Sequence, residues 1–490
     1  MQLKNLLKGL AAVDKDMRVT GLALDSRTVM SGNVFIALDG AKQHGLMHTE
    51  QAVKKGACGI IFDPAGGGAQ LAEQINDVAL VAVEGLGLKL GEIAARFYNY
   101  PSRTMDVIGI TGTNGKTSCS QFLSQLLDDC GVIGTLGWGD RGKLHNTLNT
   151  TPDALTIQKI LAELLNNKKT AVAMEVSSHG LEQGRVNGIV FKGAVFTNIS
   201  RDHLDYHQSM DAYVQAKLTF LEKPGLAFAV VNLDDAYSRQ ISAAVPESVV
   251  IWGVSVKGKT SAAGESVNAA NIVHQIDGIE FDIRWREYAQ RVKVPLYGDF
   301  NSENVLTVLT VMLAMGISFK DAVNRLTHIK AVTGRMERLF GEQEPLIFID
   351  YAHTPDALDK VLSSLRKHSN EDLWVVFGCG GNRDTGKRAQ MGKIAERWAD
   401  HVIVTDDNPR FENGLDIVRE ILTGCSSDKV EVIQNREQAI QQVISKAAEH
   451  DCIVIAGKGH EQYQEINGVR LPFSDKRIAL EALKMRAANR

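Results

Sequence analysis

The stretch "GITGTNGKTS", which begins at Gly109, combines residue types that bind phosphate. Its glycines at 112 and 115 would let backbone N–H groups converge on phosphate oxygens, aided by the positive end of a following helix. Lys116 could reach the β- and γ-phosphates of a nucleotide, and the Thr117 hydroxyl could ligate Mg²⁺. The alternative interpretation is a glycine-rich turn with a solvated lysine.

The segments on either side of this stretch favour the phosphate site. "DVIGIT" has the composition of a strand, and "KTSCSQFLSQLLDD" has that of a helix. A strand, a glycine-rich loop and a helix in this order form the context that a phosphate-binding loop needs. The usual G-x-x-x-x-G-K-[ST] spacing is not met, because residue 110 is isoleucine rather than glycine. The sequence therefore predicts a nucleoside triphosphate site that departs from the usual loop.

Three polar side chains downstream could complete such a site. Glu175 in "AMEVSSHG" ends a predicted strand, where a second Mg²⁺-binding carboxylate would lie. His203 follows the next predicted strand, and Lys217 falls inside a predicted helix in "SMDAYVQAKLTFLE". Taken singly, each has a plain alternative. Glu175 could cap a helix, His203 could be a packed imidazole, and Lys217 could be a solvated charge.

The stretch "TDDNPRF" at residues 405–411 directly follows the apolar run "HVIV". Two carboxylates, an amide, a proline and an arginine after a buried strand have two interpretations. They could form a capped polar turn, or they could clamp a ligand that is both charged and polar.

Elements that alternate between strand and helix must position these residues. The alternation predicts an α/β fold with largely parallel sheets, divided into three domains at residues 1–103, 104–332 and 333–490. The central block holds the phosphate loop. In the third block, "LIFID", "LWVVFG", "HVIVT", "VEVIQ" and "CIVIAG" are each followed by a helix-like segment. This block predicts a doubly wound, Rossmann-like sheet whose ligands lie beyond the carboxyl ends of its strands.

Composition narrows the class of protein. The 490 residues are 44% hydrophobic and 23% charged, and the net charge of −4 gives no electrostatic case for binding nucleic acid or an anionic membrane. No stretch approaches the roughly 18 consecutive apolar residues of a membrane span. The six cysteines are scattered without a C-x-x-C pair. Reduced thiols in a cytoplasmic enzyme are therefore expected, with no membrane and no nucleic acid as partner.

Taken together, the motifs resemble those of the Mur ligase family, the ATP-dependent amide-forming enzymes of peptidoglycan assembly. The stretches that carry the resemblance are "LDSRTVMSGNVFIAL", "GTNGKTS", "EVSSHGL", "FTNISRDHLDYH", "YVQAKLTFL", "GDFNSENV", "GRMERL", "DYAHTPDAL", "FGCGGNRD" and "GKGHE". They cover most of the chain, and "GTNGKTS" matches the shortened phosphate loop of the family. The resemblance implies an N-terminal UDP-substrate domain, a central P-loop ATPase domain and a C-terminal Rossmann-like domain.

Within the family, the chain is most similar to the ligases that add the third residue of the stem peptide. The resemblance implies that ATP phosphorylates a carboxylate of UDP-N-acetylmuramoyl-L-alanyl-D-glutamate, and that an amine of meso-diaminopimelate attacks the acyl phosphate. Mg²⁺ is the implied cofactor, ATP the co-substrate, and the protein a monomer. An L-lysine-adding ligase and a folylpolyglutamate synthase-like ligase are alternatives within this chemistry. An NTP-driven switch and a metabolite kinase are alternatives from other classes.

The family's site residues map onto this sequence. The implied catalytic residues are Lys116, Glu175, His203 and Lys217. The implied Mg²⁺ ligands are Thr117, Glu175, His203 and Lys217 as its carbamate. The implied ATP contacts are Gly112, Thr113, Asn114, Gly115, Lys116, Thr117, Ser118, Asn301, Arg335, Asp350 and His353. The implied contacts to the UDP-muramoyl dipeptide are Leu24, Ser26, Ala41, Lys42, Gln43, Asn149, Thr150, Thr151, Ser177, Gln183 and Arg185.

For the amine substrate, the resemblance implies Arg383, Asp407, Asn408, Pro409, Arg410, Gly457 and Glu461. In this family "DNPR" marks the ligases that add meso-diaminopimelate, whose far end carries a carboxylate that L-lysine lacks. Arg410 would bind that carboxylate with two parallel hydrogen bonds, and Asp407 and Asn408 would orient the neighbouring ammonium. Glu461 would pair with an ammonium.

Lys217→Ala is expected to remove most ligase activity. In this family the matching lysine reacts with CO₂, and the carbamate turns a cation into an anion that can ligate a second Mg²⁺. A short-chain carboxylate added to the assay should restore part of the ADP release. Near-normal turnover of the alanine variant would contradict the implied role.

Overall fold

The computed structural model has a mixed α/β fold, and its contacts divide the chain into two compact units. The described residues are 1–40, 42–262, 264–275, 277–339, 345–368, 371–426 and 429–488. The first unit comprises Met1–Thr111, Leu127–Ala194 and Ala216–Ala227, and the second comprises Gly112–Leu126, Val195–Gln215 and Phe228–Arg490. No helix within the described residues is long and apolar enough to span a bilayer.

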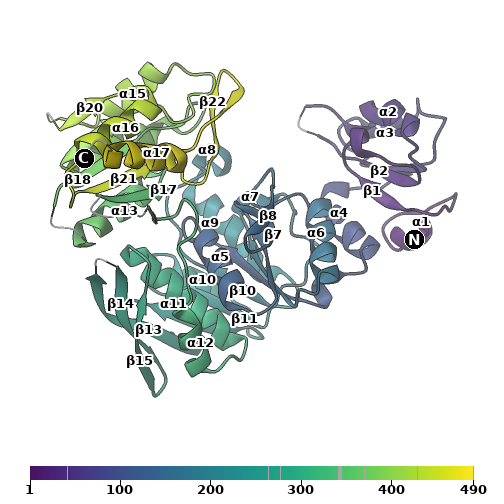
Figure 1. Ribbon diagram of the computed structural model, residues 1–490. Helices are drawn as coiled ribbons and strands as arrows, with labels where there is room; N and C mark the ends of the chain where they lie inside the picture. Colours follow the sequence, from purple (N-terminus) through teal and green to yellow (C-terminus); the bar gives the residue numbers. More distant parts are fainter. Residues whose placement is uncertain are drawn as a thin grey trace. The chain divides into compact units, whose positions relative to one another are not determined.

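A four-stranded parallel sheet forms the N-terminal part of the first unit, with strand order β1-β2-β3-β4 (Figure 1). Its elements are α1 (Leu3–Leu6), β1 (Gly21–Ala23), β2 (Asn33–Ala37), α2 (Thr49–Lys54), β3 (Gly59–Phe62), α3 (Gly68–Ala72), β4 (Leu80–Ala82) and α4 (Leu86–Phe97). Successive side chains of β2 point to opposite faces, so Val34 joins one hydrophobic cluster and Phe35 joins another. Both faces of this sheet are therefore covered.

The rest of the first unit contains the strand that leads into the phosphate loop. Its elements are β5 (Asp106–Thr111), β6 (Cys130–Gly134), β7 (Gly137–Asp140), β8 (Lys143–His145), α6 (Ala154–Asn166), β9 (Ala171–Glu175) and α7 (Ser178–Glu182). These strands follow the order β5-β9-β6-β7-β8, in which β9 is parallel to both β5 and β6. All residues of β9 are buried, as expected of a parallel strand covered on both faces.

The second unit begins with α5 (Lys116–Leu126) and continues through a further run of strands. Its elements before residue 330 are α8 (Leu204–His207), β11 (Phe228–Asn232), α10 (Ser238–Ala244), β12 (Val250–Ser255), β13 (Gly264–Gln275), β14 (Gly278–Trp285), β15 (Tyr288–Val294), α11 (Asp299–Ala314) and α12 (Phe319–Leu326). The elements β10 (Gly193–Phe196) and α9 (Met210–Leu218) cross the boundary between the units. Strands β11, β12 and β13 are parallel, whereas β13, β14 and β15 form an antiparallel meander that the sequence did not predict.

The C-terminal part of the second unit is a doubly wound sheet with order β16-β17-β21-β18-β19-β20. Its strands are β16 (Glu337–Leu339), β17 (Leu346–Asp350), β18 (Leu373–Phe377), β19 (His401–Val404), β20 (Val430–Val432) and β21 (Cys452–Ala456). Its helices are α13 (Pro355–His368), α14 (Arg388–Trp398), α15 (Gly414–Leu422), α16 (Arg436–Lys446) and α17 (Asp475–Ala488). The five predicted strands are all present, and only the edge strand β16 is antiparallel.

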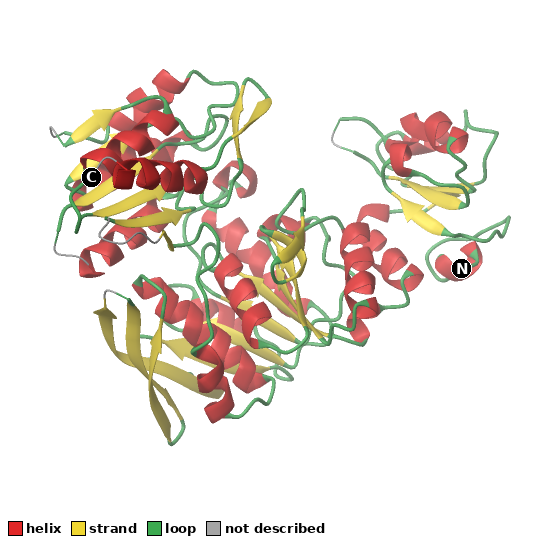
Figure 2. Cartoon of the chain, in the orientation of Figure 1, coloured by secondary structure: helices red, strands yellow, loops and turns green. Residues whose placement is uncertain are grey.

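Helices cover both faces of this sheet (Figure 2). Phe348 of β17 packs in the cluster formed with α13, α14 and α15, while its neighbours Ile347 and Ile349 pack in the cluster formed with α16 and α17. A hairpin of β22 (Tyr463–Ile466) and β23 (Val469–Pro472) lies outside the sheet. The expected Rossmann-like architecture of the third block is confirmed.

A buried ion pair joins α16 to α17. The Arg436 guanidinium donates two hydrogen bonds of 2.8 Å to the Asp475 carboxylate and a third of 2.8 Å to the Ala456 carbonyl at the end of β21. Both charged side chains are fully buried. Removing one partner of such a pair leaves the other charge uncompensated in the interior.

Asp475→Ala is therefore expected to lower the free energy of opening of the C-terminal sheet by about 3–5 kcal/mol. Amide hydrogen exchange of peptides covering β21 measures this opening in the full chain. Glu481→Ala, which breaks an exposed pair with Arg477 on the same helix, is the control and should cost less than about 1 kcal/mol. Equal exchange rates in the Asp475 and Glu481 variants would contradict this account of the pair.

Candidate active site

The phosphate loop connects β5 to α5, as predicted. Gly112 and Gly115 have positive φ angles of 144° and 87°. A Cβ atom on Gly115 would lie 2.6 Å from Asn304 Oδ1, and one on Gly112 would overlap Thr197 Oγ1. Both positions therefore exclude side chains, which lets the loop backbone pack closely before the N-terminus of α5.

Two basic side chains, Lys116 of the loop and Arg335 from later in the chain, contact the phosphate loop. Lys116 Nζ donates hydrogen bonds of 2.7 and 2.9 Å to the carbonyls of Gly112 and Thr113. Arg335 Nη2 donates to Thr117 Oγ1 at 3.3 Å, and its guanidinium lies 4.5 Å from the centre of the Tyr351 ring. Two cations thus flank the place where a triphosphate would bind.

Asp202 is a carboxylate beside this loop that the sequence analysis missed. Burial raises its pKa, but the positive charges of His203, His353 and Lys116 outweigh burial and hold the pKa below its usual value. His203 Nε2 lies 3.4 Å from Asp202 Oδ2, and its side chain is 44% exposed, so the alternative of a packed imidazole is wrong. The position of Asp202 directly before His203 in "SRDH" was the available signal.

A cavity extends from the phosphate loop to the C-terminal sheet of the same unit. Its lining residues are Asn114, Gly115, Ser118, Asn198, Phe300, Glu303, Asn304, Arg335, Asp350, Tyr351, Ala352, His353, Ala357, Lys360 and Val361. Six of these were predicted as nucleotide contacts, while Asn301 is absent from the lining. Asn301 Nδ2 instead donates to the Tyr297 carbonyl at 2.7 Å, and Asn301 Oδ1 accepts from Asn304 at 3.0 Å.

Asp350 is the last residue of β17 and His353 follows this strand, and both side chains make hydrogen bonds to the backbone. The Asp350 carboxylate accepts from the backbone N–H groups of Met336 and Ala352, each at 2.7 Å, and burial raises its pKa. His353 Nδ1 lies 2.8 Å from the Tyr351 carbonyl, and burial lowers the pKa of His353. Both side chains are thus held by backbone groups beside the cavity.

Asp356 ties the phosphate loop to α13. Its Oδ2 atom accepts hydrogen bonds from Asn114 Nδ2 at 2.9 Å, from Ser200 Oγ at 3.2 Å and from Lys360 Nζ at 3.0 Å. One carboxylate therefore holds the phosphate loop, the segment after β10 and the first turns of α13 together.

A second site lies in the first unit around Glu175. This carboxylate is fully buried and accepts from Thr135 N at 2.9 Å and from Thr135 Oγ1 at 3.0 Å. Thr150 Oγ1 lies 3.0 Å from Thr135 Oγ1, and Thr151 Oγ1 donates to the Glu175 carbonyl at 3.0 Å. The cap of the following helix α7 is Ser177, so the alternative of Glu175 as a helix cap is wrong.

Several residues predicted for the muramoyl peptide come together here. Arg185 Nη1 donates to the Thr151 carbonyl at 2.8 Å, and Arg185 Nε donates to Gln183 Oε1 at 2.9 Å. Ser177 N donates to Thr151 Oγ1 at 3.0 Å, while Asn149 is exposed in the loop before these residues. The structure thus links Arg185, Gln183 and Ser177 to Thr151, which in turn contacts the Glu175 backbone.

The residues predicted to contact the UDP end of the substrate come after two neighbouring parallel strands of the N-terminal sheet. Leu24 and Ser26 follow β1, and Lys42 and Gln43 follow β2. Ser26 Oγ donates to Gln51 Oε1 at 2.6 Å, whereas Lys42 and Gln43 are exposed. Ala41 lies outside the described residues.

Lys217 of α9 is buried, with 1% of its surface exposed. The alternative of a solvated charge is therefore wrong. A buried ammonium needs compensation, which makes this position chemically unusual.

The residues predicted for the amine substrate lie beyond the ends of three strands of the C-terminal sheet. Arg383 follows β18, "DNPR" follows β19, and Gly457 and Glu461 follow β21. A Cβ atom on Gly457 would lie 2.6 Å from Asp407 Oδ2, and one on Gly380 would lie 2.8 Å from Arg410 Nη1 and 3.9 Å from Arg383 Cγ. The structure thus brings Gly457 close to Asp407, and Gly380 close to Arg410 and Arg383.

Lys458 is a buried cation in this cluster that the sequence analysis missed. Its Nζ donates to Asn408 Oδ1 and to Glu461 Oε2, each at 3.0 Å. Asn408 Nδ2 donates to the same carboxylate at 2.9 Å. Two groups predicted to meet a ligand ammonium are therefore already oriented by a lysine of the chain.

The hairpin β22–β23 packs on "DNPR". Glu465 N donates to Asn408 Oδ1 at 2.9 Å, and Arg410 N donates to the Glu465 carbonyl at 2.9 Å. Arg410 has a positive φ of 53°, and its Nη1 donates to the Gly381 carbonyl at 2.8 Å. The turn "NG" at residues 467–468, a strong hairpin signal, could have predicted this element.

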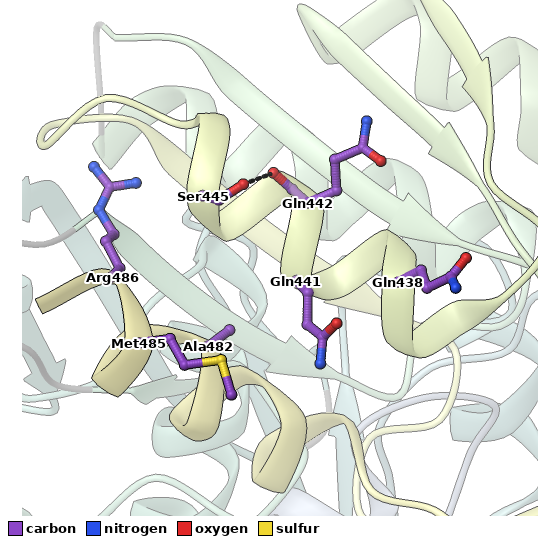
Figure 3. A pocket seen from close by; sticks show the side chains of 7 residues that line it. All are labelled: Gln438, Gln441, Gln442, Ser445, Ala482, Met485 and Arg486. Carbon is purple, nitrogen blue, oxygen red and sulfur yellow. Dashed lines mark hydrogen bonds between the residues drawn. The ribbon is translucent and has the colours of Figure 1, made fainter. Parts of the chain in front are cut away.

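A groove between α16 and α17 holds none of the predicted residues (Figure 3). Its volume is about 620 Å³, and its lining consists of Gln438, Gln441, Gln442, Ser445, Ala482, Met485 and Arg486. It carries no carboxylate and lies on helices rather than at strand ends.

Three family models match consecutive stretches of the chain. "Mur ligase family, catalytic domain" matches residues 18–98, "Mur ligase middle domain" matches residues 110–312, and "Mur ligase, glutamate ligase domain" matches residues 334–459. A UDP-N-acetylmuramoyl-L-alanyl-D-glutamate--2,6-diaminopimelate ligase of Pseudomonas aeruginosa is 44% identical over 482 residues, which cover 96% of each chain.

This chain belongs to the Mur ligase family. A ligase of the same name from Xanthomonas campestris pv. campestris is 45% identical over 489 residues, covering 99% of this chain and 97% of the relative. A solved structure of a ligase of that name is 35% identical, with a TM-score of 0.67 over 96% of this chain and 95% of that chain. A MurF structure from Acinetobacter baumannii, with 17% identity, a TM-score of 0.68 and 98% of each chain covered, shares the fold. The resemblance and the three-domain α/β fold are confirmed, while the boundaries at residues 103 and 332 remain predictions.

The donor set of this Mur ligase fits a hard cation. Within the described ranges, no three His, Cys, Asp or Glu side chains gather as a metal site. Thr117 offers a hydroxyl oxygen in the second unit, and Glu175 offers carboxylate oxygens in the first unit. Oxygens of these kinds are the ligands that Mg²⁺ prefers. Because Mg²⁺ keeps several waters and binds substrate phosphates, one or two protein oxygens suffice.

Asp356→Ala is expected to loosen the phosphate loop. Hydrogen bonds to a charged acceptor contribute about 1.5–3 kcal/mol, so local opening of the loop should become roughly 10- to 100-fold more frequent. Amide hydrogen exchange of peptides covering residues 112–118 measures this change.

Asp359→Ala on the same helix is the matched control, because that carboxylate accepts from Trp398 Nε1 rather than from the loop. Unchanged loop exchange in the Asp356 variant, or an equal increase in the Asp359 variant, would contradict the proposed link.

Proposed function

We propose that this chain is an ATP-dependent ligase that adds meso-2,6-diaminopimelate to UDP-N-acetylmuramoyl-L-alanyl-D-glutamate in peptidoglycan precursor synthesis. The observation that carries the proposal is the near full-length likeness, at 42–45% identity, to ligases of that name. The "DNPR" cluster beyond β19 supports the choice of amine.

The first step must activate a carboxylate, which is a poor acyl donor because oxide is a poor leaving group. The substrate carboxylate attacks the γ-phosphorus of ATP, the bond between that phosphorus and the bridging oxygen breaks, and ADP leaves. Lys116 and the N–H groups of the phosphate loop would neutralise the phosphates during this transfer. Arg335 would add a second cation beside Thr117. The site would thereby favour attack by the substrate carboxylate over attack by water.

Mg²⁺, when bound, would supply further charge neutralisation on the phosphates. Thr117 and Glu175 would hold it, with His203 and a carbamylated Lys217 as further ligands. Lys217 is buried in α9, as expected of a residue that acts inside the protein rather than as a solvated surface charge.

The acyl substrate would be oriented by the residues around Glu175. Arg185 is the strongest candidate, because its guanidinium can bind a carboxylate through parallel hydrogen bonds. Asn149, Thr150, Thr151, Ser177 and Gln183 would contact the muramoyl peptide, and Leu24, Ser26, Lys42 and Gln43 the UDP end.

The amine then attacks the acyl carbon, and the tetrahedral intermediate collapses to an amide as phosphate leaves. Arg383 and Arg410 would bind the far carboxylate of diaminopimelate, and Asp407 and Glu461 would accept from its ammonium groups. Asn408 would orient the same amino-acid centre, held by Lys458. L-Lysine lacks the far carboxylate, so it could not form these hydrogen bonds with the two guanidinium groups.

We also propose that the enzyme works as a cytoplasmic monomer. The six cysteines form no disulfide, which suits a reducing compartment.

ADP release should require the acyl substrate, ATP and the amine together, and meso-diaminopimelate should exceed L-lysine in kcat/KM by roughly 10⁴-fold. Arg410→Ala should narrow this ratio, whereas Arg419→Ala, at an exposed pair with Asp416, should preserve it.

The rivals give different outcomes in this assay. ADP release without an amine indicates an ATPase switch, a stable phosphorylated product indicates a kinase, and a preference for glutamate indicates a folylpolyglutamate synthase-like ligase. Equal efficiency with the two diamino acids would refute the selectivity.

A further inference from the structure

The cavity beside the phosphate loop is lined by both apolar and polar side chains. Phe300 of α11 and Ala357 and Val361 of α13 line the same cavity as Gly115 and Ser118. If the triphosphate occupies the phosphate loop, a planar base fits best against these apolar side chains. This step rests on the proposed use of ATP.

Glu303 lines the same cavity. Its Oε2 atom accepts a hydrogen bond of 3.2 Å from Asn232 Nδ2, which is the one hydrogen bond to this carboxylate among the described residues. Burial raises the pKa of Glu303, with Asp234 acting in the same direction and Lys360 and Lys257 opposing it. The carboxylate thus retains capacity to accept a hydrogen bond from a ligand.

The neighbouring amide has less capacity left. Asn304 Nδ2 donates to Asn301 Oδ1 at 3.0 Å, and Asn304 Oδ1 accepts from Cys119 Sγ at 3.5 Å. Lys360, also in the lining, donates to Asp356 at 3.0 Å. Of these three lining side chains, Glu303 keeps the most capacity to accept a hydrogen bond from a base edge.

We propose that Glu303 selects adenine over 6-oxopurines, by accepting a hydrogen bond from the exocyclic amino group at position 6 of the base. A 6-oxo group would instead place an acceptor against the carboxylate, so that no hydrogen bond could form between the 6-oxo oxygen and the carboxylate oxygen that faces it. A site built to accept from a donor rejects an analogue that lacks it. Glu303 is thus a specificity-determining residue for the nucleotide.

The test compares binding of ATP and of ITP, whose base carries oxygen instead of the amino group at position 6, to the full-length protein with Mg²⁺ by calorimetry. The measurement is made at about pH 8, which is well above the ordinary pKa range of a carboxyl group. Wild-type protein should bind ATP roughly 10- to 100-fold more tightly than ITP. Glu303→Ala should reduce this ratio to within about 3-fold, mainly through weaker ATP binding.

Glu303→Gln is the isosteric second variant, because its amide can donate to a 6-oxo group as well as accept from a 6-amino group. It should lower the ATP-to-ITP ratio by improving ITP binding. Glu437→Gln, on the exposed face of α16, is the matched control and should keep the wild-type ratio.

A wild-type ratio near one, or variants at position 303 that keep the wild-type ratio, would overturn this proposal and leave ATP use intact. Binding of neither nucleotide would overturn both. Failure of amide formation with intact ATP selectivity would refute the proposed ligase reaction alone.

Discussion

Close packing around the phosphate loop is the constraint on which the candidate site depends. Thr197 Oγ1 donates to the Asn114 carbonyl at 2.6 Å, and Asn198 Oδ1 accepts from Asn114 N at 3.0 Å. The loop can approach these residues only because positions 112 and 115 are glycines. A loop backbone held in this way needs little rearrangement when phosphate binds, which is the basis of electrostatic preorganisation.

The cluster of polar residues around "DNPR" is also fixed before a ligand binds, but by charged side chains and a hairpin rather than by glycines. Lys458 fixes the positions of Asn408 and Glu461, and the hairpin β22–β23 fixes the backbone of Arg410. Side chains that are oriented before the ligand binds lose less entropy when it does. A zwitterionic amino acid can therefore be distinguished by a few fixed groups.

Much of the fold could be predicted because it rests on local patterns. The apolar runs of the third block predict β17–β21, and the glycines and lysine of "GTNGKTS" predict the loop before α5. The antiparallel meander β13–β15 and the edge strand β16 were missed, since short or half-exposed strands leave weak periodicity.

The candidate site was predictable only in part, because many of its contacts join distant segments. Asn114 and Asp356 are 242 positions apart, and no pattern in either segment points to the other. Lys458 and Glu303 were missed for the same reason. The resemblance to the family implied roles for particular motif residues. Asp356, Lys458 and Glu303 are not among those residues.

The most direct measurement follows oxygen through the ligase reaction. The acyl substrate is prepared with ¹⁸O in the D-glutamyl carboxylate that becomes the amide, and the released phosphate is analysed by mass spectrometry. An acyl phosphate carries one carboxylate oxygen into phosphate, so one ¹⁸O should appear in each phosphate released. Amide formation with unlabelled phosphate would contradict activation of the carboxylate at the phosphate loop.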